Sequence, residues 1–166
     1  MTDGKILGGA HGGVYVLKFA GDVRVTLCST VDAFLDEMFS DADFQSVLVD
    51  LTETEGIDST SLGLLARLSL RTCDRLGVVP TVVSTRPDIT RLLVSMGLDD
   101  VLQIITEPLE HKEQLGELER KHASEEDLRQ RVIEAHQALM SLNESNREAF
   151  KDLISTLEGS PGPSQV

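Results

Sequence analysis

The stretches VLVDL at residues 47–51 and IDSTSLGLL at residues 57–65 set the architecture of this chain. The first is a short, nearly continuous apolar run, which is typical of a central strand covered on both faces. The polar residues 52–56 between the two stretches predict a loop. Helical periodicity starts after Asp58, a suitable N-cap, and Gly77 ends it. The pattern therefore predicts a buried strand, a loop and a helix whose first turn carries a serine.

Upstream of this unit, the pattern predicts a hairpin and a helix. Residues 14–19 and 23–27 read as two strands that turn at residues 21–22, and residues 30–39 carry one apolar helical face. Four glycines lie between residues 8 and 13, but they lack the Gly-Lys-Ser/Thr ending of a phosphate-binding loop. These glycines are therefore expected to form a turn.

Downstream, strand and helix patterns continue to alternate. Residues 81–84 and 101–105 predict strands, and residues 88–96 between them predict a short helix. Short connections between such units indicate a parallel sheet with right-handed crossovers. The fold class expected from this order is α/β.

Composition limits the possible partners and the compartment. The 166 residues include 40% apolar residues and no Trp, and the formal net charge is −13. A surface this acidic disfavours nucleic acid and anionic membranes but is compatible with a basic protein partner. No signal peptide or membrane span is evident, so we expect a cytoplasmic protein. Cys28 and Cys73 are expected to be buried, unpaired thiols, as in a reducing compartment.

A helical extension follows the alternating part. We expect one domain over residues 1–106, the extension over residues 107–158 and a disordered tail over residues 159–166. Beyond Pro108 no strand pattern remains, and a capping box starts at Ser124. The extension reads as one long helix with an interruption or as a helical hairpin. Its apolar stripe could serve intramolecular packing, self-association through residues 124–158 or docking to another protein.

Ser59 is the candidate functional residue. It lies in the first turn of the predicted helix, at the carboxyl end of the predicted buried strand. Phosphorylation would add about −1.5 to −2 charges there, and a helix N-terminus accommodates an anion. Because Glu53, Glu55 and Asp58 are already negative, a phosphate would increase local repulsion. This chemistry would release a bound partner without unfolding the domain.

The segment around Ser59 resembles the signature of STAS domains, and of bacterial anti-sigma-factor antagonists in particular. In that family an apolar strand leads into Asp-Ser-Ser/Thr-Gly-Leu at a helix start. The resemblance covers about residues 5–106 and includes Leu62 and Gly63 at the end of the motif. It implies that Ser59, beside Asp58, is the phosphoacceptor of a partner kinase that also acts as the anti-sigma factor.

The resemblance also implies the fold and the binding surface. The fold would be a STAS-type mixed β-sheet with helices packed on one face, to which this chain adds the C-terminal helical extension. Ser61 departs from the usual glycine, so Thr60 or Ser61 could compete as phosphoacceptors. The partner-binding surface would comprise the start and outer side of the Ser59 helix: Leu62, Gly63, Leu64, Leu68 and Arg71.

Three functions follow as alternatives. The leading one is a phosphorylation-controlled antagonist, which binds an anti-sigma factor or serine-kinase-type regulator and is reset by a serine phosphatase. It would be a substrate of those enzymes and not an enzyme itself. The second is a constitutive STAS subunit of a transporter or sensory assembly. The third, a hydrolase with Ser59 as nucleophile, lacks a Gly-x-Ser-x-Gly elbow and a histidine close in sequence. We expect no cofactor and no metal, because the four histidines lack ligand spacing.

Overall fold

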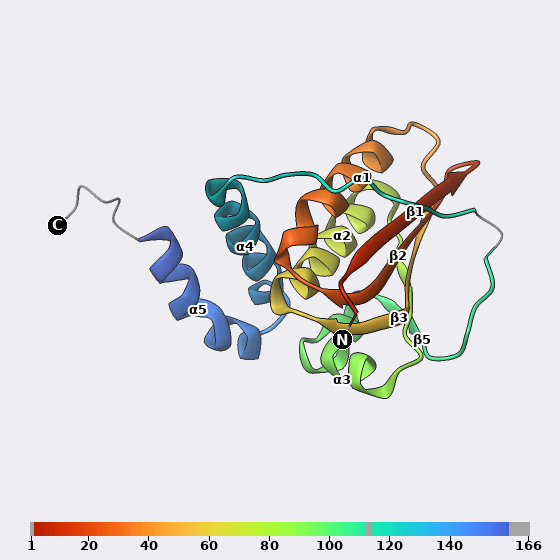
Figure 1. Ribbon diagram of the computed structural model, residues 1–166. Coiled ribbons are helices and arrows are strands. Elements are labelled where there is room, and N and C mark those ends of the chain that lie inside the picture. The colour runs from red at the N-terminus through yellow and green to blue at the C-terminus, as the bar shows by residue number, and fades with distance from the viewer. Residues whose placement is uncertain (1, 112–113, 160–166) are drawn as a thin grey trace.

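A six-stranded mixed sheet forms the centre of the molecule (Figure 1). The computed structural model describes residues 2–111 and 114–159. The strand order is β5-β4-β3-β2-β1-β6, in which β2 to β5 run parallel and β1 is antiparallel to both of its neighbours. The strands are β1 (Lys5–His11), β2 (Val14–Val23), β3 (Ser46–Ile57), β4 (Thr81–Val83), β5 (Gln103–Ile105) and β6 (Gly116–Glu117). The α/β class and the mixed sheet implied by the STAS resemblance are confirmed.

Helices pack on one face of this sheet and enclose an aliphatic core (Figure 1). Leu17 and Phe19 of β2 and Val49 of β3 are fully buried against Leu35 and Leu65 from the helices. The apolar periodicity of the sequence therefore marks the covered face correctly. The helices of this part are α1 (Cys28–Ser40), α2 (Ser59–Leu76) and α3 (Pro87–Ser95), with 3₁₀ turns η1 (Val25–Leu27) and η2 (Leu98–Asp100).

The predicted hairpin of residues 14–19 and 23–27 is absent, whereas the turn expected at the glycines between residues 8 and 13 is present and joins β1 to β2. β1 and β2 turn at Gly12 and Gly13, whose φ angles of 59° and 84° suit the tight turn that joins antiparallel strands. Gly21 also has a positive φ, yet it lies inside β2, where the register against β3 shifts. The chain therefore continues straight to Val23, and the residues after it form the η1 turn instead of a second strand.

β3 is longer than predicted. Residues 52–56, which were expected to form a loop, continue the strand because β2 runs beside them as far as the Val23–Ile57 pair. Thr54 is fully buried, and its hydroxyl donates a hydrogen bond to the Phe19 carbonyl at 2.8 Å. The parallel partner strand thus compensates for the polar composition.

After β5 the chain returns to the far edge of the sheet. His111 Nε2 lies 3.4 Å from Asp50 Oδ2 of β3, and β6 pairs with β1 and forms the edge of the sheet. The expectation of no strand beyond Pro108 is therefore wrong. A two-residue strand is too short to leave an alternating pattern in the sequence.

The extension folds as a helical hairpin, one of the two forms that its sequence allows. Helices α4 (Glu125–Met140) and α5 (Glu144–Glu158) follow one another, and Ser124 caps α4 as expected. Between the helices, Asn143 caps α5 by accepting a hydrogen bond from the Asn146 amide at 2.7 Å. α4 packs along α2, which is the intramolecular packing considered above. The predicted tail lies outside the described residues except for Gly159.

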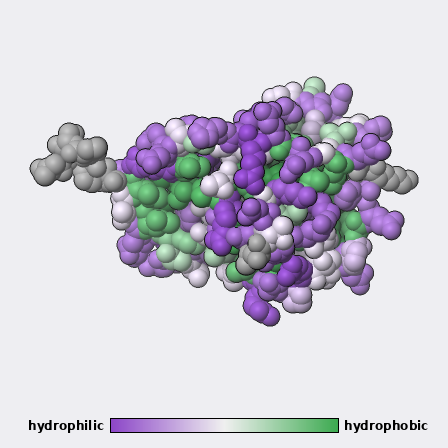
Figure 2. All heavy atoms as spheres, in the orientation of Figure 1, coloured by the Kyte–Doolittle hydropathy of each residue, from purple (hydrophilic) through white to green (hydrophobic). Residues whose placement is uncertain are grey.

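The surface matches the acidic composition. Figure 2 shows a mostly hydrophilic face, with a green apolar area over the α4–α5 end of the molecule. Partly exposed side chains of α5, Phe150, Leu153 and Leu157, belong to this end. Within the described ranges, no helix has both the length and the apolar character needed to cross a membrane.

Candidate functional site

The candidate site lies where β3 ends and α2 begins. Asp58 is the N-cap of α2, as predicted, and its Oδ1 accepts a hydrogen bond from the Ser61 amide at 2.8 Å. Its Oδ2 accepts a second hydrogen bond from the Val25 amide, also at 2.8 Å. One carboxylate therefore fixes both the start of α2 and the preceding η1 turn, and it places Ser59 in the first turn of the helix.

Three neighbouring hydroxyls differ in their access to solvent. Thr60 is 6% exposed and Ser61 is 0% exposed, whereas Ser59 is only half-buried. Ser61 Oγ lies 3.9 Å from the thiol of Cys28 in α1, so the residue that departs from the family glycine points into the core. Among the three candidate phosphoacceptors, Ser59 is the most accessible.

Ser59 contacts a histidine from the extension. Its Oγ lies 2.8 Å from His136 Nε2 in α4. His136 Nδ1 lies 2.7 Å from the Val132 carbonyl, which can only accept, so Nδ1 carries a proton. In the neutral ring Nε2 then accepts a hydrogen bond from the Ser59 hydroxyl. The ring is 2% exposed and packs edge-on against Phe150, with ring centroids 4.8 Å apart.

The histidine was missed in the sequence. From the sequence, His136 counted only as one of four histidines without metal-ligand spacing, and the residue is buried in α4. A signal was present, because His136 follows Val132 by four residues and precedes Leu139 by three, on the apolar stripe of α4. A polar residue in such a stripe requires a partner. Only the fold reveals that this partner is Ser59.

Two further contacts join α2 to α4 at intervals of one helical turn. A Cβ atom placed on Gly63 would lie 2.3 Å from the Ala135 carbonyl oxygen, so the backbones approach too closely for any side chain there. One turn later, Arg67 Nη1 lies 3.3 Å from Glu134 Oε2. Ser59, Gly63 and Arg67 thus form one stripe of α2 that α4 covers.

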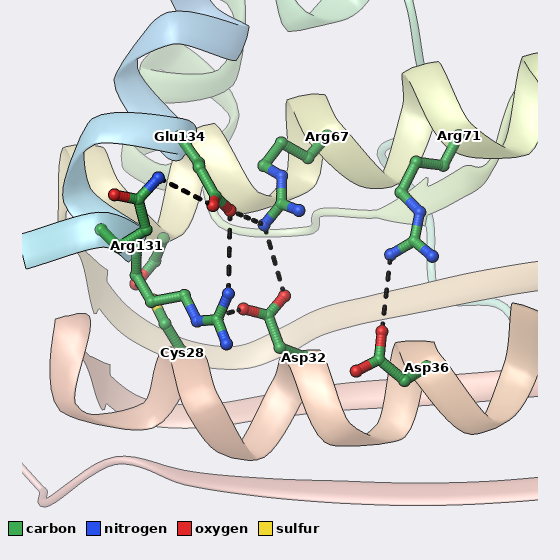
Figure 3. Close-up of polar contacts among 9 residues, drawn as sticks. Cys28, Asp32, Asp36, Arg67, Arg71, Arg131 and Glu134 are labelled. Carbon is green, nitrogen blue, oxygen red and sulfur yellow. Dashed lines mark hydrogen bonds and ion pairs between the residues drawn. The ribbon is translucent and has the colours of Figure 1, made fainter. Parts of the chain in front are cut away.

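A charged cluster ties this interface to α1 (Figure 3). Asp32 of α1 lies 3.5 Å from Arg67 Nη1 and 2.9 Å from Arg131 Nε, although the latter pair is not aligned as a hydrogen bond. Arg131 also lies 3.7 Å from Glu134 Oε2. Burial raises the pKa of Asp32 above its ordinary value, and the two arginines oppose this shift. The cluster therefore joins α1, α2 and α4 through charges that are only partly solvated.

The predicted binding surface is only partly available. Leu64 and Leu68 were expected on the outer side of α2, but they are 3% and 1% exposed and belong to the core cluster. The expectation failed because α1 and α4 both pack against α2, and its leucines join the core cluster together with residues of the sheet. Leu62 and Gly63 are buried too. Arg71 remains partly exposed, 3.8 Å from Asp36 and stacked over the Phe39 ring.

The two cysteines also differ from each other. Cys28 is buried as expected, and its burial raises the pKa of the thiol to about 12. Cys73 is exposed, which contradicts the expectation. It lies near the end of α2, where Thr72 and not Cys73 faces the protein interior.

The arrangement offers a hydroxyl for modification and no metal centre. Among the described residues, no group of three or more His, Cys, Asp or Glu side chains could hold a metal ion. The Ser59–His136 pair is oriented by a backbone carbonyl, without a carboxylate on Nδ1.

Comparison with known proteins identifies the family. The family model described as STAS domain matches residues 9–113, which include the end of β1, strands β2 to β5 and helices α1 to α3. A comparison with curated proteins returned no match. The matched region covers more than half of the 166 residues and includes the Asp58–Ser59 helix start. With the mixed sheet and the helices on one of its faces, this match shows that the chain belongs to the STAS domain family.

Proposed function

We propose that the chain is a phosphorylation-controlled anti-sigma-factor antagonist. In its unphosphorylated form it binds an anti-sigma factor or a related kinase-like regulator through the surface around Ser59. The kinase moves the terminal phosphoryl group of a nucleoside triphosphate to Ser59 Oγ, the hydroxyl proton leaves, and the diphosphate departs. A serine phosphatase hydrolyses the ester and restores binding. The chain is the substrate of both enzymes, acts in the cytoplasm and needs no cofactor.

The position of Ser59 carries this proposal. It is the motif serine of a STAS domain, it follows the capping aspartate Asp58, and it is more accessible than Thr60 and Ser61. Because the N-terminus of α2 favours negative charge, a phosphate there is compatible with an intact helix. A switch of this kind changes the surface while the domain remains folded.

The charges around Ser59 support release by repulsion. Asp58 is adjacent, and Glu53 and Glu55 lie at the end of β3. Lys18 pairs with Glu53 and Asp50 further back along the sheet. Arg24, whose charge interacts with that of Asp58, already pairs with Asp22. A phosphate of about −1.5 to −2 charges therefore adds to an acidic surface instead of neutralising a basic one. A partner whose surface matches the neutral hydroxyl therefore loses its steric fit to this site.

Capture of partners from a native lysate tests the proposal. The full chain is used as bait in the wild-type form and as Ser59→Ala and Ser59→Asp, and the captured proteins are read by mass spectrometry. Ser95→Asp, at the exposed end of α3, is the matched control for an added carboxylate. We expect wild type, Ser59→Ala and Ser95→Asp to retain an anti-sigma-type partner that Ser59→Asp loses.

Equal capture by all four baits would refute the switch. A complex indifferent to Ser59→Asp would favour the constitutive STAS subunit of a transporter or sensory assembly. Covalent labelling of Ser59 by an activated serine reagent would instead indicate a hydrolase.

A further inference from the structure

Helix α4 of this chain covers the surface of α2 around Ser59. We propose that α4 is a built-in competitor for this surface, so that it must leave before a partner can bind there or a phosphate can occupy Ser59. The masking of a partner rests on the proposed function. The competition between α4 and a phosphate does not, because it follows from the α2–α4 contacts alone.

The contacts between α4 and α2 cover the stripe of α2 that begins at Ser59. Three consecutive residues of α4 contact three residues of α2 that are spaced four apart. His136 contacts Ser59, Ala135 contacts Gly63, and Glu134 contacts Arg67. The stripe that contains the motif residues Ser59 and Gly63 is therefore covered by this chain itself. An external protein can reach the same stripe only when α4 is displaced.

A phosphate does not fit beneath the docked helix. The 2.8 Å between Ser59 Oγ and His136 Nε2 is a direct hydrogen-bond distance, with no space for a phosphorus atom and three oxygens. The imidazole cannot simply withdraw, because Nδ1 is held by the Val132 carbonyl and Phe150 packs against the ring. With the Ser59 side chain oriented as it is here, the added group therefore pushes α4 away from α2.

The rest of the interface makes the docked state the resting state. Leu139 is fully buried in the core cluster with Ala138, and Arg131 reaches across to Asp32 of α1. Beyond α4, Asn146 Nδ2 donates to the Met96 carbonyl at 2.8 Å and so ties α5 to the end of α3. Displacement must overcome these contacts, so a phosphate or a partner supplies the free energy that opens the cover.

Hydrogen exchange of the full chain tests the phosphate step without any partner. Phosphoserine is incorporated at position 59 during synthesis, and exchange is followed by mass spectrometry. We expect peptides of residues 125–140 to exchange at least roughly tenfold faster than in the unmodified protein. Peptides of β2 and β3 should keep their protection, which shows that the domain is folded. Equal or greater protection of α4, as in a phosphate–imidazolium pair, would overturn the proposal.

A substitution on α4 tests the masking step. Ala135→Gln adds bulk at the contact with Gly63, and Ala149→Gln, exposed on α5, is the matched control. We expect only Ala135→Gln to speed exchange of α4 and to raise the affinity for the partner captured by the wild-type bait. If Ala135→Gln speeds exchange of α4 but leaves the affinity for the partner unchanged, the proposal that α4 masks the partner site is wrong. If no partner is captured at all, the proposed function fails, and the phosphoserine exchange experiment still decides the competition.

Discussion

Ser59 Oγ and His136 Nε2 lie 2.8 Å apart, although 77 residues separate them in the sequence. The contact joins a serine inside the region matched by the STAS family model to a helix that follows that region. The hydroxyl through which the switch would operate is thus already engaged within the chain. Any binding or modification at Ser59 has to be understood together with the extension.

Removing the Asp58 carboxylate should weaken the start of α2. Asp58→Ala leaves the amides of Ser61 and Val25 without their acceptors, so we expect a loss of about 1–2 kcal/mol in the free energy of unfolding. Urea denaturation measures it. Asp58→Asn keeps one acceptor oxygen and should lose less than Asp58→Ala. A loss close to zero for Asp58→Ala would show that the cap contributes little.

Adding a methyl group at Gly63 should separate α4 from α2. Alanine favours the helix, but its Cβ would lie 2.3 Å from the Ala135 carbonyl oxygen. We expect Gly63→Ala to cost about 1–3 kcal/mol and to speed hydrogen exchange in α4. Gly116→Ala is the control, because nothing lies within 4 Å of a Cβ placed there. A Gly63→Ala variant as stable and as protected as wild type would contradict the close approach.

The apolar patterns of the sequence predicted α1 to α3 and the positions of β2 to β5, because these elements bury apolar side chains in the core, whereas the two-residue β6 left no pattern. The length of β3 was not predictable, since residues 52–56 are polar and become a strand only because β2 lies beside them. The same reason explains Gly21, which reads as a turn but serves a shift of register inside β2. The composition of a segment does not show which strand will lie beside it in the fold.

The site was predicted in part for a related reason. Asp58 and Ser59 are adjacent to the apolar strand pattern, so their positions follow from local sequence. The burial of Leu64 and Leu68 depends on the helices that cover α2, and the role of His136 depends on how α4 docks. Such contacts between distant segments leave only the weak signal of a polar residue in an apolar stripe.

The pH dependence of stability should report on Asp32. Burial raises the pKa of Asp32 in the folded state, so just above its ordinary value of 3.8 the folded protein keeps a proton that the unfolded chain has released. The contribution of Asp32 to the free energy of unfolding should therefore fall as pH rises through that window. Asp32→Asn should remove this component, which is measured as the difference between the two stability curves. If the free energy of unfolding of the wild type minus that of Asp32→Asn rises with pH, then Arg67 and Arg131 dominate and lower the pKa of Asp32.

Thiol chemistry should distinguish the two cysteines. Because burial raises the pKa of Cys28 to about 12, its thiolate is negligible near neutral pH, whereas Cys73 is exposed. A chromogenic disulfide reagent should titrate one thiol in the native protein and two after denaturation. Cys73→Ser should leave the native protein unreactive. Rapid reaction of that variant would contradict the burial of Cys28.

Affinity for the captured partner tests the central claim most directly. Two full-length proteins, both with Ala135→Gln so that α4 is displaced in each, differ only in serine or phosphoserine at position 59. Each is titrated calorimetrically with the partner captured by the wild-type bait. The account predicts that the phosphoserine form binds at least roughly tenfold more weakly, which corresponds to about 1.4 kcal/mol. Equal affinities would contradict it, because Ser59 would then not control partner binding.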